Sequence, residues 1–142
     1  MQLRTEWLPP KKPLGLDVCS PITLVGSCFA SYLDGFLGKS GMASVASPTG
    51  ICYNPLTVAT ALDYLEGAKE PSPTGIISHG SWTCHYDFHG EHAAADPDLW
   101  QQQAAARIRE AKTRFQSSST VIITLGTSWV YHHKQLGQVV NN

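Results

Sequence analysis

This sequence of 142 residues lacks a large net charge. Ten lysine and arginine residues face 11 aspartate and glutamate residues, which leaves a net charge of -1. Nucleic acids and anionic membranes attract proteins with strongly basic surfaces, so neither partner is indicated. Hydrophobic residues nevertheless make up 42% of the chain, an ordinary fraction for a folded globular domain.

A long apolar run is also missing. The start, MQLRTEWLPP, lacks the apolar core of a secretory signal peptide and of a membrane-spanning helix, so a cytoplasmic location is expected. The four cysteines contain no C-x-x-C pair, which favours free thiols over a disulfide or zinc framework. They are Cys19, Cys28, Cys52 and Cys84. We therefore expect no metal and no cofactor.

Short apolar runs alternate with helical patterns along the rest of the chain. Proline-rich residues 1–20 are predicted to form an extended arm. The alternation of strands and helices after this arm indicates a parallel sheet with helices on both faces. The expected strands are 22–25, 42–46, 81–90 and 121–125, and the expected helices are 28–37, 55–65 and one that begins at Pro97.

Local signals refine three of these segments. Asn54-Pro55 and Asp96-Pro97 each place a capping side chain before a proline, which is typical of a helix start. SWTCHYDFHG (81–90) alternates in a hairpin-like insert, with Trp82, Cys84, Tyr86 and Phe88 on one face and Thr83, His85, Asp87 and His89 on the other. LGQVVNN at the end is predicted to be a turn followed by a strand.

Three loops are expected at the carboxyl ends of parallel strands, where sites form in open α/β sheets. These loops hold Ser27-Cys28, residues 47–54 and residues 126–128. Ser27 precedes a helix, whose free N–H groups could hold an oxyanion if the serine attacked a carbonyl. Two alternatives stay open: Ser27 is only a helix N-cap, or the Cys28 thiol at the helix start is the nucleophile.

The histidines raise two further possibilities. His85, His89 and His92 have the spacing of one helical face, but the strand alternation in the same segment speaks against a shared metal site. Asp87 and His89 fall on one face of the expected strand, so they are candidate site residues as a carboxylate–imidazole pair. A solvated polar face is the alternative interpretation of the same residues.

The motif GSCFA at 26–30 resembles the signature of the GSCFA domain family. YNP (53–55), SWTCHYDFHG (81–90) and ITLGTSWVY (123–131) follow in the order of that family, so the resemblance extends from about residue 21 to the end. The family is similar to the SGNH/GDSL hydrolases. The resemblance implies a three-layer α/β/α sandwich with a flavodoxin-like parallel sheet, of which residues 21–142 form an N-terminal part that is incomplete at its C-terminus.

The resemblance also implies site residues. Ser27 matches the nucleophile, Gly50 matches the glycine donor of the oxyanion hole, and Gly126 matches the glycine of the third block. Ser128 stands where those hydrolases have an asparagine, and Asn54 from the neighbouring loop is expected to supply the amide.

The D-x-x-H segment that carries the base of those hydrolases does not occur in this sequence. The base is therefore expected beyond residue 142, and this fragment is expected to be inactive alone, with one sheet edge unpaired. The expected function is that of an esterase or acyltransferase acting on a small-molecule or glycan ester. A non-catalytic binding module on the same fold and a thiol enzyme using Cys28 are the alternatives.

Overall fold

A computed structural model describes residue 8, residues 15–16 and residues 19–141 of the chain. Most of the predicted extended arm, residues 1–20, lies outside the described residues. None of the described helices is long and apolar enough to cross a membrane. The core of the domain starts with the first strand at Ile22.

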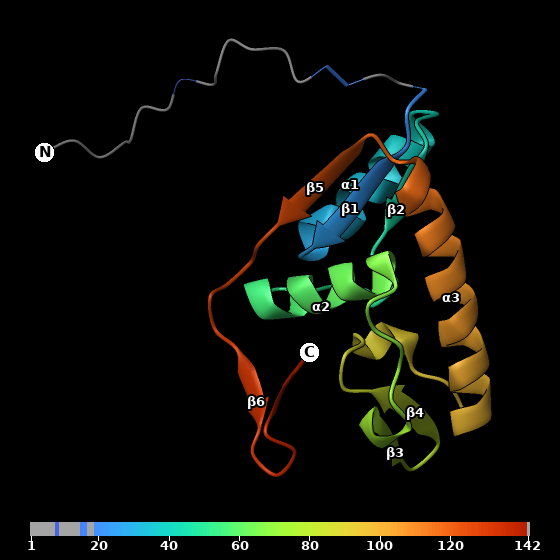
Figure 1. Ribbon diagram of the computed structural model, residues 1–142, viewed down its shortest axis with the longest axis vertical. Coiled ribbons are helices and arrows are strands. Elements are labelled where there is room, and N and C mark those ends of the chain that lie inside the picture. The colour runs from blue at the N-terminus through green and yellow to red at the C-terminus, as the bar shows by residue number, and fades with distance from the viewer. Residues whose placement is uncertain (1–7, 9–14, 17–18, 142) are drawn as a thin grey trace, which may run out of the picture.

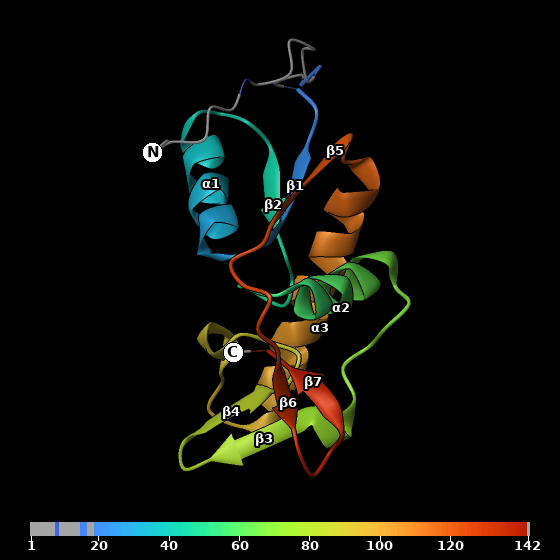
Figure 2. The same cartoon turned by 90° about the vertical axis from the view of Figure 1, so that its left-hand side faces the viewer.

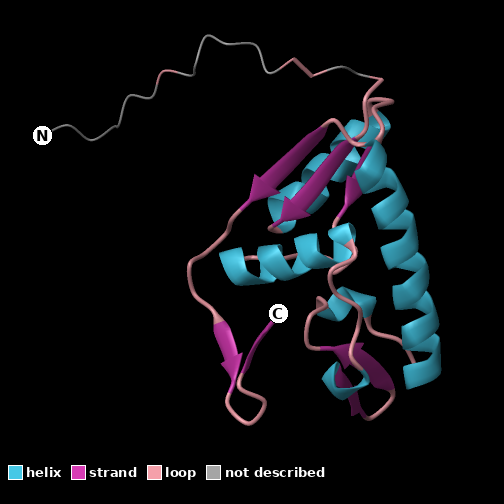
Figure 3. Ribbon diagram, in the orientation of Figure 1, coloured by secondary structure: helices cyan, strands magenta, loops and turns pink. Residues whose placement is uncertain are grey.

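Strands and helices follow the predicted order, with additional short strands (Figures 1 and 3). The helices are α1 (Cys28–Lys39), α2 (Pro55–Glu66) and α3 (Pro97–Ser117), with short 3₁₀ helices at Pro73–Gly75 and Gly90–His92. The strands are β1 (Ile22–Gly26), β2 (Ser44–Ala46), β3 (Ile76–His79), β4 (Trp82–His85), β5 (Thr120–Thr124), β6 (Tyr131–His133) and β7 (Gln138–Val140).

The main sheet has three parallel strands in the order β2-β1-β5. Ile22 at the start of β1 pairs with Ser44 on one side and with Thr120 on the other. Because all three strands run in the same direction, their carboxyl ends meet at one edge of the sheet. The loops that were predicted to carry the site therefore do come together.

Helices cover both faces of this sheet (Figure 2). Ile22 and Leu24 of β1 pack with Ala30 of α1 on one face. The alternate residue Val25 packs on the other face with residues of α2 and α3, including Ala61 and Ala111. This period-2 alternation in a buried central strand produces the three layers, and it confirms the predicted α/β class.

The predicted helix starts of α2 and α3 are confirmed. The Asn54 side-chain oxygen accepts hydrogen bonds from the N–H groups of Leu56 and Thr57, both at 3.0 Å. The Asp96 carboxylate accepts from Leu99 N–H at 2.8 Å. A proline occupies the first turn of each helix, where its missing N–H would have had no partner.

The strand predicted over 81–90 is too long. β4 ends at His85, and the Phe88 N–H donates to the His85 carbonyl in a turn. Trp82 is 44% exposed, whereas Cys84 on the same face and Thr83 and His85 on the other face are buried, so both faces of β4 are covered. The reason is tertiary: β4 pairs with β3, and the His85 ring stacks on Trp100 of α3 at a centroid distance of 5.2 Å.

A second hairpin forms near the C-terminus. The predicted turn and strand in LGQVVNN are confirmed as the end of this hairpin, but its first strand, β6, was not predicted. Asn141 fixes the hairpin to the rest of the chain, because its N–H donates to the Tyr86 carbonyl and its side-chain amide donates to the Ile51 carbonyl at 3.0 Å. The hairpin is thus held close to the loop that follows β2.

Both outer strands of the main sheet have an unpaired edge. Within the described residues, β2 and β5 each pair with β1 alone. Val121 and Ile123 of β5 lie opposite Thr23 and Val25 in the register, but unlike those two residues they are exposed. Helices α2 and α3 thus cover β1 and leave this face of β5 in water. The sequence-based expectation was one unpaired edge, whereas the described sheet has two.

Candidate functional site

Main-chain hydrogen bonds tie the three loops at the carboxyl edge of the sheet together. The Cys52 N–H, from the loop after β2, donates to the Gly26 carbonyl at 2.7 Å. The N–H groups of Gly126 and Thr127, from the loop after β5, both donate to the Tyr53 carbonyl. A rigid backbone frame therefore surrounds the residue that follows Gly26.

Ser27 is that residue, and only 6% of its surface is exposed. It occupies the N-cap position of α1, but its side chain makes no cap hydrogen bond. Its hydroxyl instead lies 3.0 Å from the hydroxyl of Thr124 at the end of β5. Ser27 thus stands at the predicted N-cap position, but its hydroxyl leaves the first N–H groups of the helix without a side-chain acceptor.

Thr124 holds Ser27 at more than one atom. The Ser27 N–H donates both to the Thr124 hydroxyl oxygen and to the Thr124 carbonyl, each at 3.0 Å. Sequence reasoning missed Thr124. No local sequence signal could have found it, because only the parallel pairing of the two strands brings their last residues, Gly26 and Thr124, side by side.

Glycine at position 26 makes this close approach possible. Its φ of +140° lies in a region that L side chains rarely adopt, and a Cβ there would lie 2.7 Å from the Thr124 hydroxyl oxygen and still closer to the Thr124 carbonyl. The close contact with the backbone of β5 therefore requires glycine as the first residue of the GSCFA motif. The same contact positions the second residue, Ser27.

The backbone donors suggested for an oxyanion hole are already used. The Gly50 N–H donates to the Ser47 carbonyl and the Gly126 N–H to the Tyr53 carbonyl. Ser128 lies exposed in the loop after β5. Gly126 is nevertheless close to the site, since a Cβ there would lie 3.5 Å from the Cβ of Ser27.

Asn54 retains one free donor group. Its Oδ1 is occupied as the cap of α2, with Leu56 and Thr57 as donors. The chemistry of the cap requires an oxygen at that position, so the Nδ2 amino group is the part of the side chain that can serve a ligand. Asn54 also lines a pocket together with Thr127 of the neighbouring loop.

The helix N-terminus supplies further donors. The first N–H groups of an α-helix have no partner within the helix, and those of Cys28 and Phe29 have no partner elsewhere among the described residues. They lie directly after Ser27. The Cys28 side chain is exposed, so the thiol remains accessible next to the buried serine hydroxyl.

Asp87 and His89 do not form the suggested pair within the described structure. The Asp87 carboxylate accepts a hydrogen bond from the Tyr64 hydroxyl at 2.7 Å and pairs with Lys69 at 2.9 Å. His89 caps the short 3₁₀ helix by accepting from the Glu91 N–H. The chain turns after β4 and sends the two side chains to separate clusters. Burial and the Asp87 hydrogen bond raise the pKa of Tyr64.

The three spaced histidines also separate. His85 is buried against Trp100, whereas His89 and His92 flank Glu91 in the 3₁₀ helix. The spacing of four and three residues would place them together only on one continuous α-helix. No group of three or more potential metal ligands occurs in the part of the chain that the structure describes.

His92 carries a strongly lowered pKa of about 4. Burial is the main cause, and the positive charge of Arg107 adds to it. Between pH 6.5 and 4 the unfolded chain binds a proton at His92 that the folded chain does not bind, so stability falls as the pH falls through this range. We expect a loss of about 2 kcal/mol from this group, measured by urea unfolding at both pH values.

The His92→Gln variant should lose less stability between these pH values than the unchanged chain. Burial also lowers the pKa of His85, which therefore contributes to the same slope in both proteins. The exposed His79 provides a matched control, and His79→Gln should keep the full slope. An unchanged slope in His92→Gln would contradict the assignment.

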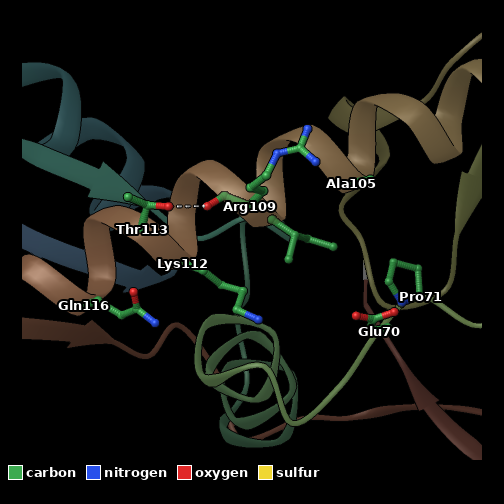
Figure 4. Close-up of a pocket in the computed structure, with 8 residues that line it drawn as sticks. Glu70, Pro71, Ala105, Arg109, Lys112, Thr113 and Gln116 are labelled. Carbon is green, nitrogen blue, oxygen red and sulfur yellow. Dashed lines mark hydrogen bonds between the residues drawn. The ribbon is translucent and has the colours of Figure 1, made fainter.

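Another pocket lies away from the strand ends. It has a volume of roughly 420 Å³ and opens between α3 and the segment that follows α2 (Figure 4). Lys112 points from α3 toward α2, where a Cβ on Gly67 would lie 2.5 Å from its Nζ. No serine or cysteine lines this pocket, and the nucleophiles that the sequence suggests, Ser27 and Cys28, lie elsewhere.

Residues 21–142 match the GSCFA family. No curated protein and no solved structure matches the chain. The match begins one residue before β1 and includes Gly26, Ser27 and Thr124, so it covers the whole sheet and all three loops of the site.

Proposed function

Because the chain belongs to the GSCFA family, we propose that it provides the nucleophile of a serine hydrolase or acyltransferase, with Ser27 as that nucleophile. The observation that carries the proposal is the position of the Ser27 hydroxyl. It lies at a helix N-terminus without capping the helix, and Thr124 holds it in place. A serine that served only the fold of α1 would use its oxygen as the cap.

The proposed reaction proceeds through an acyl-enzyme. The Ser27 Oγ attacks the carbonyl carbon of an ester, the bond from that carbon to the alcohol oxygen breaks, and the serine proton passes through a general base to the departing alcohol. Water then cleaves the acyl-serine ester in hydrolysis, or a second alcohol takes the acyl group in transfer. The ester is that of a small molecule or a glycan.

Negative charge develops on the carbonyl oxygen of the ester during the attack. Hydrogen-bond donors that have no partner before the reaction can stabilise this charge. The N–H groups of Cys28 and Phe29 and the Nδ2 of Asn54 meet this condition, so we assign the proposed oxyanion hole to them. Ser27, Gly50 and Gly126 have already donated their N–H groups. Asn54→Ala should therefore lower turnover, and unchanged turnover would remove Asn54 from the proposal.

Labelling distinguishes this proposal from its alternatives. The full-length protein is treated in parallel with a fluorophosphonate probe and with iodoacetamide, and the modified residues are mapped by mass spectrometry. We expect the fluorophosphonate on Ser27, with no label in Ser27→Ala and retained label in Cys28→Ala. Label on Cys28 with loss of activity would support a thiol enzyme instead. Absence of label and of p-nitrophenyl ester turnover would leave a binding module.

A further inference from the structure

A pocket of roughly 290 Å³ lies at the carboxyl edge of the sheet, between the start of α2 and the β6–β7 hairpin. Three of its lining residues are aromatic and three are uncharged and polar. They are Tyr53, Trp129 and Tyr131, and Asn54, Thr127 and Asn141. No lysine, arginine, aspartate or glutamate is among them, so a charged ligand would find no counter-charge in the pocket.

The pocket is a direct neighbour of the candidate nucleophile. Gly126 lies between the two, since a Cβ on this glycine would lie 3.5 Å from the Cβ of Ser27 and 2.9 Å from the Cδ1 of Tyr53. Because Gly126 has no side chain, Ser27 and the Tyr53 ring can both lie close to its backbone. Gly126 therefore separates Ser27 from Tyr53, one of the residues that line the pocket.

The aromatic side chains of this pocket are unusually open to water. Trp129 is 82% exposed and Tyr131 is 59% exposed. The backbone beneath Trp129 is fixed, because its N–H donates to the Thr127 hydroxyl oxygen at 3.0 Å. A large, exposed aromatic surface next to a pocket is typical of a binding surface, since its contact with water is unfavourable.

Amide groups complement these rings. The Asn54 Nδ2 carries two hydrogens, so one can serve the proposed oxyanion hole and the other a ligand in this pocket. The Asn141 Nδ2 donates to the Ile51 carbonyl, which fixes the plane of that amide beside the pocket and leaves its carbonyl oxygen as an acceptor. The pocket therefore offers apolar ring faces together with an uncharged donor and acceptor.

We propose that this pocket binds the alcohol part of the ester as a neutral sugar ring. A pyranose presents C–H groups on its faces, which pack on Trp129 and Tyr131, and hydroxyl groups at its rim, which bond to the amides of Asn54 and Asn141. A carboxylate or phosphate on the ligand would meet no positively charged side chain among the lining residues. This inference rests on the proposed function, because it names the substrate class at the same site.

The test measures binding in the Ser27→Ala variant, so that turnover plays no part. Saturation-transfer NMR is recorded with methyl glycosides of glucose, galactose, mannose and xylose, with methyl glucuronide as the charged counterpart and cyclohexanol as an apolar ring. We expect at least one neutral glycoside to bind through its ring protons, and the glucuronide and cyclohexanol to bind more weakly.

Substitutions locate the binding. Adding Trp129→Ala should weaken glycoside binding roughly 2- to 10-fold, as expected for one aromatic contact, and Trp129→Phe should restore part of it. Trp82→Ala removes an exposed tryptophan on β4 that does not line the pocket, so it should leave binding unchanged. Thermal unfolding of each variant verifies that it is folded.

The outcomes separate this inference from the proposed function. If Ser27 takes the fluorophosphonate but no neutral glycoside binds, or if binding is the same in Trp129→Ala, the sugar site is wrong and the nucleophile stands. If glycosides bind through Trp129 but Ser27 takes no label, the proposed hydrolase is wrong and the sugar site stands. Preferential binding of cyclohexanol or of the glucuronide also overturns the sugar site.

Discussion

Replacing Gly26 by alanine should destabilise the protein by about 3 to 5 kcal/mol, as the sum of two costs. The first is the backbone, because φ is +140° at this position. The second is steric, because the new Cβ would collide with the carbonyl of Thr124 on the neighbouring strand. Relief of this collision requires β1 and β5 to separate at the end where Ser27 and Thr124 meet.

Urea unfolding of Gly26→Ala against the unchanged chain measures this cost. Gly38→Ala is the matched control, because Gly38 lies within α1 and a Cβ there would meet nothing within 4 Å. Alanine is the better helix former, so this variant should gain about 0.5 to 1 kcal/mol. Equal unfolding midpoints for Gly26→Ala and the unchanged chain would show that the strands do not approach as described.

Removing the Thr124 hydroxyl should slow the reaction of Ser27 about 100-fold, the size of effect that follows from a small misplacement of a reacting group. In Thr124→Val the Ser27 hydroxyl loses its side-chain partner, and one of the two acceptors of the Ser27 N–H disappears. The serine side chain can then rotate to cap α1, which is the usual position for an N-cap serine.

The rate of fluorophosphonate labelling at Ser27 measures this effect. Thr124→Ser keeps the hydroxyl and should retain most of the rate, whereas Thr124→Val should not. Thermal unfolding distinguishes a loss of positioning from a loss of fold, because Thr124→Val keeps the shape of the side chain. Equal labelling rates in the two variants would show that the Thr124 hydroxyl does not position Ser27.

Local sequence signals predicted much of the scaffold. The two Asn/Asp-Pro pairs determined where α2 and α3 begin, since a cap and a proline act within one helical turn. Apolar runs predicted β1 and β5, although only β1 is a central strand that is buried on both faces. The strand predicted over 81–90 was wrong because its pattern was compatible with a longer strand, and pairing with β3 decided where β4 ends.

The sequence by itself determined that Ser27 follows a strand and precedes a helix, and that it belongs to a family motif. Only the tertiary structure decided what its hydroxyl does. Ser27 and Thr124 are 97 positions apart in the chain, and no local pattern specifies a contact over that distance. Parallel pairing of β1 with β5, with glycine at position 26, brings the two hydroxyl groups together and thereby takes Ser27 out of its role as a helix cap.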